Sequence, residues 1–347
     1  MSQAQEQQAT IDFYRYPPVG AEDWKYAYQT AKVRVLDTMM VSHGTFVDMA
    51  NATGYEAAVE LLASGEYAQA ASAAAFTQIE EMLLEKRSEA RQLFVELMDD
   101  ERIVELLRAR EDFANMRLAV RRVVTERPIG VDYSNEGSVT AEEFEEIFET
   151  ENYGRFPDYL QEAVEFAVLG YYESKDIRQI DHGIDKEQAI YKIKKAEEIG
   201  SEFLTSLFRT QIDITNIRTM LRLKAAERDD RNLFLDGGFV ETARFVQGLD
   251  AGYETLSGLF YATCYSDIID GGVSYLTANQ SFLGLEKLCE EHIIGFLKTT
   301  QSIAAGPQPV IAYLLRKENE IRTLRMVLSG KKNGLDAKLI LDRLSEI

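Results

Sequence analysis

The stretch 112–121, DFANMRLAVR, recurs 101 residues later as the stretch 213–222, DITNIRTMLR. Both copies follow the template Asp-x-x-Asn-x-Arg-x-x-x-Arg. The template places Asn115 with Arg117 in the first copy and Asn216 with Arg218 in the second. A repeat of this length is the size of a domain and too long for a solenoid unit, so the chain should contain related domains.

A third stretch, 318–326 or ENEIRTLRM, shares Ile-Arg-Thr with the second copy. Its Arg322 lies 104 residues after Arg218, Glu320 takes the place of the asparagine, and the last arginine, Arg325, comes one residue early. We therefore expect an all-α protein of three similar helical domains. A pseudo-threefold, funnel-shaped arrangement is the architecture that three such domains suggest.

Boundaries are expected where apolar periodicity lapses and turn residues gather. This occurs at 127–137, RPIGVDYSNEG, and at 228–232, RDDRN, with DGG at 236–238 just beyond. The predicted organisation is then a flexible segment at 1–21, followed by helical domains at 22–130, 131–232 and 233–347.

Three long segments, 77–124, 185–226 and 307–328, carry apolar residues at intervals of three, four and seven, which is typical of amphipathic helices. None of the six prolines interrupts them, and Pro307 and Pro309 begin the last one. Glycine inside a helix lowers its propensity, so we expect a bend at Gly200.

Capping residues give the expected helix ends. Thr77 with Glu80 and Thr140 with Glu143 match the capping box, and Asp185 with Gln188 is a weaker match. Gly330, followed by two lysines, is the expected stop of the third segment, because glycine tolerates a positive φ and cations suit a helix C-terminus.

The composition excludes several function classes. The 347 residues carry 38 Lys and Arg against 58 Asp and Glu, a formal net charge of −20, which disfavours binding to nucleic acid or directly to anionic lipid. No window approaches 18 uninterrupted apolar residues, and the N-terminus lacks the features of a secretory signal. We expect a cytosolic protein whose attachment to a membrane, if any, goes through another protein, and whose Cys264 and Cys289 are buried thiols.

Motifs of cofactor chemistry are missing from the sequence. Neither G-x-x-x-x-G-K-[ST] nor G-x-G-x-x-G occurs, and Ser329-Gly-Lys331 ends a helix where a phosphate loop would begin one, so nucleotide binding is not expected. Position i−3 of the three histidines, His43, His182 and His292, is Met, Gln and Cys, so no Glu-x-x-His metal pair exists. We predict no metal, no cofactor and no catalytic residue, with His182 beside Asp181 on a solvated loop.

The repeated polar residues allow two interpretations. Buried amides and arginines on helices need partners, and hydrogen bonds between helices within each domain would supply them. Alternatively, a ring of arginines on the inner wall of a funnel would grip an acidic or carbonyl-rich element of a partner. The residues of this candidate interface or inter-helix motif are Asn115, Arg117, Asn216, Arg218, Glu318, Glu320, Arg322 and Arg325.

The stretch 306–325, GPQPVIAYLLRKENEIRTLR, closely resembles the C-terminal signature of the C subunit of V/A-type ATPases, known as the d subunit in eukaryotes. Supporting matches lie at 213–224, at 236–240 (DGGFV) and at 32–37 (KVRVLD), so the resemblance covers most of the chain beyond about residue 22. One departure is that the first domain lacks the Gly-x-x-Pro opening that precedes the third long helix.

The resemblance implies an all-helical funnel of three similar domains without an active site. Such a protein sits on the membrane rotor ring, receives the central shaft of D- and F-type subunits in its cavity, and carries torque while protons or sodium ions move. It would lie at the cytoplasmic face of the membrane, attached through protein contacts, and be a monomer when isolated.

Two other interpretations stay open at this point. One is a soluble helical adaptor with a different partner. The other is a helical enzyme that uses His182 and nearby carboxylates, which requires a pocket with a perturbed histidine.

Overall fold

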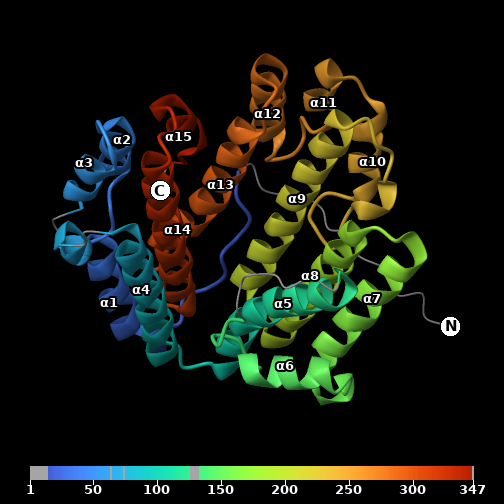
Figure 1. The fold of residues 1–347 in the computed structure, drawn as a ribbon, viewed down its shortest axis with the longest axis horizontal. Helices are drawn as coiled ribbons and strands as arrows, with labels where there is room; N and C mark the ends of the chain where they lie inside the picture. The colour runs from blue at the N-terminus through green and yellow to red at the C-terminus, as the bar shows by residue number, and fades with distance from the viewer. Residues whose placement is uncertain (1–14, 63–64, 73–74, 126–132, 346–347) are drawn as a thin grey trace. The chain divides into compact units, whose positions relative to one another are not determined.

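The computed structural model describes residues 15–62, 65–72, 75–125 and 133–345, and every regular element in these ranges is a helix (Figure 1). The all-α prediction is confirmed. The chain divides into two compact units. We call Asp100–Asp250 the central unit, and the described parts of Asp12–Asp99 and Ala251–Ile347 the terminal unit, because the latter joins both ends of the chain.

The central unit is built from consecutive helices whose long members pack side by side. Its core lies between α5, α7 and α8, where Phe113 and Met116 of α5 meet Leu160 of α7 and Ile184 of α8, all fully buried. The helices are α5 (Glu101–Thr125), α6 (Ala141–Glu149), η3 (Tyr153–Arg155), α7 (Asp158–Ser174), α8 (Ile177–Ile199), α9 (Glu202–Ala225), η4 (Arg231–Leu233) and α10 (Thr242–Asp250).

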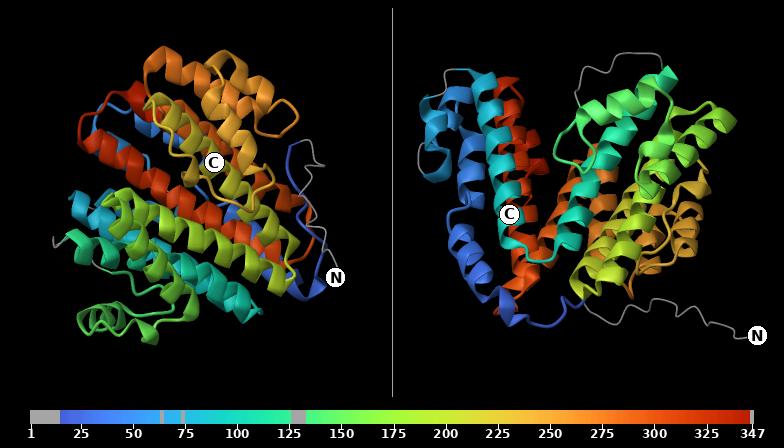
Figure 2. Two further views of the ribbon diagram at one scale, coloured as in Figure 1. Left: turned by 90° about the vertical axis from the view of Figure 1, so that its right-hand side faces the viewer. Right: turned by 90° about the horizontal axis from the view of Figure 1, so that it is seen from below.

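The terminal unit combines helices from the two ends of the sequence around the long helix α14. Figure 2 shows α14, in red, alongside α4, in blue-green. Leu324 and Val327 of α14 are buried against Ile79 of α4 and Phe46 of α2. The helices are η1 (Trp24–Tyr26), α1 (Ala27–Asp37), α2 (His43–Asn51), α3 (Tyr55–Glu60), η2 (Gly65–Ser72), α4 (Phe76–Leu97), α11 (Tyr253–Leu259), α12 (Ser266–Asn279), α13 (Leu283–Lys298), η5 (Thr299–Ser302), α14 (Pro307–Lys332) and α15 (Ala337–Arg343).

The three domains at 22–130, 131–232 and 233–347 stay a prediction, as does the flexible segment at 1–21. Residues 1–14 lie outside the described ranges. Within the remainder of that segment, Gln308 donates to the carbonyl oxygens of Val19 and Ala21 at 3.2 and 2.8 Å, and the Tyr16 ring lies 5.1 Å from that of His292.

The long periodic segment at 77–124 is two helices rather than one, which corrects the prediction. Helix α4 ends at Leu97, Met98 is extended with φ −95° and ψ 111°, and α5 begins at Glu101. Asp100 starts the second helix, because its carboxylate accepts from the backbone N–H of Arg102 at 3.1 Å. The two halves even belong to different units.

The segment at 185–226 is also broken, and more sharply than the predicted bend. Gly200 adopts φ 76°, a left-handed conformation that ends α8, and Ser201 caps α9 by accepting from the N–H of Leu204. Asp185 starts no helix; it lies in the middle of α8.

Two other predicted helix ends are wrong, and two are right. Thr77 lies inside α4, whose first turn is closed instead by Gln78, which accepts from the N–H of Ala75 at 3.2 Å. Gly330 lies inside α14, where it permits close approach of α15: a Cβ there would lie 3.0 Å from Ile340 Cδ1. The capping box of Thr140 with Glu143 is confirmed, with N–H···O distances of 3.2 and 3.0 Å. The start of α14 at Pro307 is confirmed as well.

The cysteines are both free thiols. Cys289 is buried in α13, as predicted, whereas Cys264 is only half-buried.

Candidate functional site: the repeated helix–loop contacts and their arginines

The first copy of the repeat uses its Asp and Asn to hold the loop that follows α5. The carboxylate of Asp112 accepts from the N–H of Ser138 at 2.8 Å and from that of Val139 at 3.1 Å. The side-chain amide of Asn115 donates to the carbonyl of Ser134 and accepts from its N–H, each at 2.8 Å. The side chains of Asp112 and Asn115 are buried, so these hydrogen bonds give buried polar groups the partners that they need.

The second copy repeats this arrangement on α9. Asp213 accepts from the N–H groups of Phe239 and Val240 at 2.9 and 3.1 Å, and Asn216 exchanges two 2.8 Å bonds with the backbone of Leu235. The sequence separations, 27 from Asp to valine and 19 from Asn to the loop, equal those of the first copy. We call each set of contacts a helix–loop latch.

The loops themselves are equivalent as well. The ring of Tyr133 stacks on Phe144 of α6 at 5.6 Å, and the ring of Phe234 stacks on Phe245 of α10 at 5.8 Å. In both loops a glycine lies directly over the latch carboxylate. A Cβ at Gly137 or at Gly238 would come within 2.1 Å of the Oδ1 atom of Asp112 or Asp213.

Burial makes the first latch electrostatically costly. It raises the pKa of Asp112 above its ordinary value, although hydrogen bonds from Val139 and Ser138 oppose the rise. Tyr159 of α7 donates to the same carboxylate at 2.9 Å, and burial together with Asp112 raises the pKa of this phenol. The hydrogen bonds are therefore what makes a carboxylate tolerable at this buried position.

The third copy, on α14, also binds a backbone group of another segment, but it does so through a glutamate carboxylate. Glu320 is fully buried and accepts from the N–H of Val41 at 2.8 Å, from the hydroxyl of Tyr67 at 2.5 Å and from the ammonium of Lys317 at 2.6 Å. Lys317 also pairs with Glu66 at 2.5 Å.

The segment held by Glu320 precedes α14 in the sequence, whereas the loops held by Asn115 and Asn216 follow their helices. Val41 lies 279 residues before Glu320 and leads into α2, a helix of 9 residues. Helices α6 and α10, which follow the first two latched loops, also have 9 residues each. A segment from the N-terminal part of the chain thus binds Glu320 of α14, just as the following loops bind Asn115 of α5 and Asn216 of α9.

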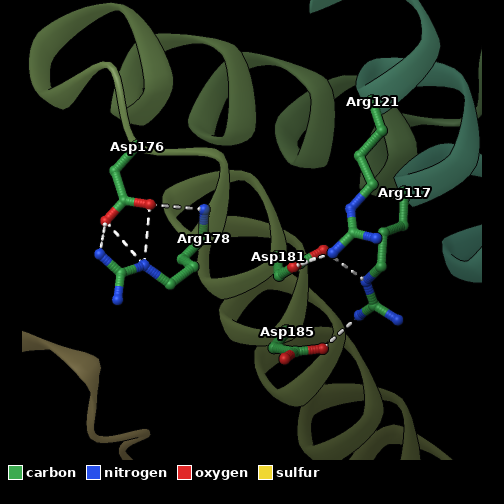
Figure 3. Close-up of polar contacts among 6 residues, drawn as sticks. All are labelled: Arg117, Arg121, Asp176, Arg178, Asp181 and Asp185. Carbon is green, nitrogen blue, oxygen red and sulfur yellow. Dashed lines mark hydrogen bonds and ion pairs between the residues drawn. The ribbon is translucent and has the colours of Figure 1, made fainter. Parts of the chain in front are cut away.

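The arginines of the first copy pair with helix α8 (Figure 3). Arg117 pairs with Asp185 and lies 3.4 Å from Asp181, while Arg121 pairs with Asp181. Burial raises the pKa of Asp185 above its ordinary value, and Arg117 opposes that rise. Asp176 caps the N-terminus of the same helix and forms an ion pair with Arg178, a separate local contact that Figure 3 also shows.

The arginines and acids of the third copy pair across the terminal unit. Arg322 bonds to Asn319 and to Glu290 of α13, which also binds Arg343 at 2.6 Å. Burial alone would raise the pKa of Glu290, but Arg322 and Arg343 outweigh burial and lower it. The two remaining pairs join α14 to α4: Arg325 with Glu80 at 2.9 Å and Glu318 with Arg91 at 2.6 Å.

The structure thus gives the predicted motif residues intramolecular contacts of two kinds. The asparagines and Glu320 bind backbone groups of loops, and Glu320 also binds Tyr67 of η2. Arg117, Arg322, Arg325 and Glu318 bridge helices. Arg218 is half-buried on α9. Whether any of these arginines also grips a partner stays a prediction.

The latch aspartates and glycines are not among the site residues predicted from the sequence. A signal was present, since Gly137, Val139 and Phe144 recur 101 residues later as Gly238, Val240 and Phe245. Extending the repeat beyond its helix into the loop would have found them.

The histidine of the enzyme hypothesis is not on a loop, which corrects that expectation. His182 lies within α8, half-buried. Burial lowers its pKa below 6.5, against the opposing effects of Asp185 and of a hydrogen bond with the Asn232 backbone. Its neighbour Asp181 is occupied by arginines, so the two do not form an acid–base pair.

One cavity of about 140 Å³ opens between α8 and α9 in the central unit. Lys192 lines it together with Asp185, Gln211, Thr215 and the ring of Phe208. Burial lowers the pKa of Lys192 to about 8. Its ammonium lies 5.6 Å from the centre of the Phe208 ring, a cation–π contact that partly offsets desolvation.

Two further observations concern the residues that the structure describes. No helix there is long and apolar enough to cross a membrane. Nor do three or more His, Cys, Asp or Glu side chains gather in these ranges as a metal site requires.

Comparison with known proteins gives a match along nearly the whole chain. The family model described as "ATP synthase (C/AC39) subunit" matches residues 29–343. The C subunit of the V-type sodium ATPase of Enterococcus hirae is 23% identical over 329 residues, which cover 91% of this chain and 96% of that protein. The C subunits of the A-type ATP synthases of Methanococcoides burtonii and Haloferax volcanii are each 26% identical, over 57% and 46% of this chain and 57% and 47% of their own lengths.

Proposed function

The chain belongs to the ATP synthase (C/AC39) subunit family, and on this basis we propose that it is a non-catalytic connector in the central stalk of a rotary V/A-type ATPase or ATP synthase. It links the rotor shaft to the membrane rotor ring and transmits torque between them, so that ATP chemistry in the catalytic head is coupled to the transport of protons or sodium ions.

The observation that carries this proposal is the extent of the family match. It runs from residue 29 to 343, and the Enterococcus hirae relative aligns over 96% of its own length. The central unit and all of the terminal unit beyond residues 15–28 and 344–345 therefore fall inside the matched range. A match over both units, rather than over one of them, supports a role as the C subunit of such a complex.

The latches suit a part that must carry load. A torque transmitter has to keep its connecting loops fixed to its helices, because a loop that yields under load would absorb rotation. Each latch holds two or more backbone groups of a loop with buried side chains, and a buried hydrogen-bonded group of this kind is costly to open. Close packing around them would provide the rest of the stiffness.

The partners in this proposal are the D- and F-type shaft subunits and the membrane rotor ring. The chain attaches to the membrane through these protein contacts, at its cytoplasmic face, and is a monomer when isolated. Three similar domains forming a funnel would receive the shaft. The protein itself turns over no ATP.

The first experiment is affinity purification of the tagged, full-length chain from gently solubilised membranes of its own host. We expect recovery together with ring, shaft and catalytic ATPase subunits, identified by mass spectrometry. Recovery of the chain alone, or with unrelated proteins only, would contradict the connector role and favour an adaptor. An equally tagged unrelated chain serves as the control for adventitious capture.

The arginine-ring hypothesis has a matched pair of variants. Arg325 and Arg102 are both exposed, with 62% and 61% of their side chains accessible, and each makes one exposed ion pair. Because such pairs contribute little to stability, neither Arg325→Glu nor Arg102→Glu should unfold the chain. If the repeated arginines contact the shaft, Arg325→Glu alone should lower recovery of the shaft subunits. Equal recovery with both variants would refute that contact for Arg325.

A further inference from the structure

Helix α1 and the turn η1 before it have two opposite faces, of which one is buried and the other exposed. The inner face, Tyr26, Thr30 and Val33, is buried in the terminal unit. There the hydroxyl of Thr30 bonds with the backbone of Gly306, immediately before α14. This face accounts for the packing of the helix on its own unit (Figure 1).

The opposite face is apolar as well, although it is exposed. We call Trp24, Tyr28, Ala31 and Val35 the outer stripe; Trp24 is 68% exposed, Tyr28 71% and Val35 63%. Met39, just beyond the helix, continues it. Trp24 is the only tryptophan among the 347 residues. Tryptophan and tyrosine are the residues most enriched at energetically important positions of protein interfaces.

The spacing of the outer stripe selects the shape of its occupant. Its members follow one another at intervals of four, three and four residues, which is the a/d pattern of a two-helix seam. A stripe of this kind is covered by the apolar face of another helix, which contributes residues at the same intervals.

The charges beside the outer stripe indicate which side chains the docking helix should carry. In the heptad that puts Trp24 and Ala31 at d, the flanking e positions are Lys25 and Lys32, and a g position is Arg34. All three flanking charges are positive in a chain whose net charge is −20. Arg34 donates to the carbonyls of Thr300, Gln301 and Ile303, whereas neither lysine ammonium has an ion-pair partner among the described residues.

We propose that the outer stripe is a docking site for an amphipathic helix of another protein, one with apolar residues at heptad spacing flanked by glutamate or aspartate. A second copy of this chain fits poorly, because pairing two such stripes would set lysine and arginine flanks against each other. The proposal does not depend on the proposed function, since it concerns binding by the isolated chain.

The test uses the emission of Trp24, which reports on the stripe directly because no other tryptophan contributes. The probe is a synthetic peptide of about three heptads with Leu at a and d and Glu at e and g, and the control peptide carries Lys at e and g. We expect a saturable blue shift of the full-length chain with the Glu peptide and none with the Lys peptide. The absence of a saturable shift with the Glu peptide overturns the proposal.

Charge reversal on the chain supplies the decisive control. Lys25→Glu/Lys32→Glu should weaken binding of the Glu peptide about tenfold and create binding of the Lys peptide. The matched variant Lys194→Glu/Lys338→Glu changes the net charge equally at two exposed lysines outside the stripe and should bind as the original chain does. If both double variants behave alike, the flanking charges do not select the partner and the proposal fails.

Further variants test whether the chain itself covers the outer stripe. Val35→Asp should abolish peptide binding without lowering the free energy of unfolding, because Val35 is exposed. A concentration-dependent dimer that disappears in Val35→Asp would show that a second copy is the occupant. A red shift of the Trp24 emission on deletion of residues 1–14 would show that those residues occupy the stripe. Either result replaces the proposed partner.

Discussion

The latches of α5 and α9 and the contact of α14 solve one problem with different chemistry. On α5 and α9 a neutral amide, Asn115 or Asn216, exchanges two hydrogen bonds with one loop residue. On α14 the charged Glu320 accepts from three donors, one of them the ammonium of Lys317. The asparagine contacts need no counter-ion, whereas Glu320 is paired with one, the buried ammonium of Lys317.

The difference follows from where the partner segment lies in the chain. The loops of the first two copies are only 19 to 27 residues from their helices, so their position is largely given by short connections. Val41 and Tyr67 come from 279 and 253 residues away. Bringing distant segments together costs more loop-closure entropy, and a charge-assisted cluster provides a larger favourable term to offset it.

The largest effect should come from removing Glu320. Glu320→Ala leaves the buried ammonium of Lys317 and the N–H of half-buried Val41 with fewer partners, and should lower the free energy of unfolding by about 4 kcal/mol. Asn216→Ala, which removes a neutral partner, should cost about 1.5 kcal/mol. Urea unfolding of both variants measures the difference.

A double variant separates charge burial from packing at the same place. Lys317→Met/Glu320→Leu removes both charges, so we expect it to recover much of the stability lost in Glu320→Ala. Equal losses in Glu320→Ala and Asn216→Ala would show that the charged cluster on α14 contributes no more to stability than the neutral amide on α9.

The latch aspartates should rank next. Asp112→Ala and Asp213→Ala each remove the acceptor of two backbone N–H groups, one of them buried, and should cost about 2 to 3 kcal/mol. Because the two latches share their geometry, the losses should agree to within about 1 kcal/mol of each other. Thermal or urea unfolding with circular dichroism would measure them, and a large loss at one site alone would break the equivalence of the two copies.

The latch glycines give a smaller, steric test. Gly137→Ala and Gly238→Ala would place a Cβ within 2.1 Å of the latch carboxylate, so the loop must shift and we expect a loss of about 1 to 2 kcal/mol. Gly258→Ala is the matched control, because its Cβ would meet nothing within 4 Å inside α11. That variant should be neutral or slightly stabilising. Equal stability of all three would show that the loops do not press on the carboxylates.

The subtlest test is the pH dependence of the first latch. Because the pKa of Asp112 is raised in the folded chain, the folded state holds this proton more tightly than the unfolded state, and its contribution to stability falls as pH rises from about 3.8 through the raised pKa. Asp112→Asn keeps an oxygen acceptor and removes the titration. Its stability relative to the original chain should therefore improve between pH 4 and pH 7, as measured by urea unfolding. A relative stability that is constant or falls over that range would mean that burial does not govern this carboxylate.

Local patterns in the sequence were sufficient for several features. Helical periodicity predicted the all-α fold, the capping box at Thr140 was correct, and the repeat of Asn115 at Asn216 corresponds to two equivalent sets of hydrogen bonds. These features depend on neighbours a few turns away, and such short-range chemistry is written in the sequence itself.

Helix ends were predicted less well where two signals competed. The apolar period runs through residues 98–100, so the segment looked continuous, yet Met98 is extended and Asp100 begins a new helix. Gly330 looked like a stop, yet α14 continues because Ile340 of α15 packs against the bare glycine. At Asp100 a local cap outweighed the apolar period, whereas at Gly330 packing against α15 accompanied continuation of the helix past a residue that usually ends one.

The sequence alone therefore determined that the chain is helical, that one motif recurs in it at a spacing of 101 residues, and which side chains mark each copy. Only the tertiary structure decided that α4 and α5 belong to different units and that α8 supplies the aspartates for Arg117 and Arg121. It also decided that Val41, far away in the sequence, donates to Glu320 of α14. The physical reason is range. Helix formation and capping are fixed by residues within a few positions, whereas the choice of packing partner depends on which distant apolar and charged surfaces fit together best.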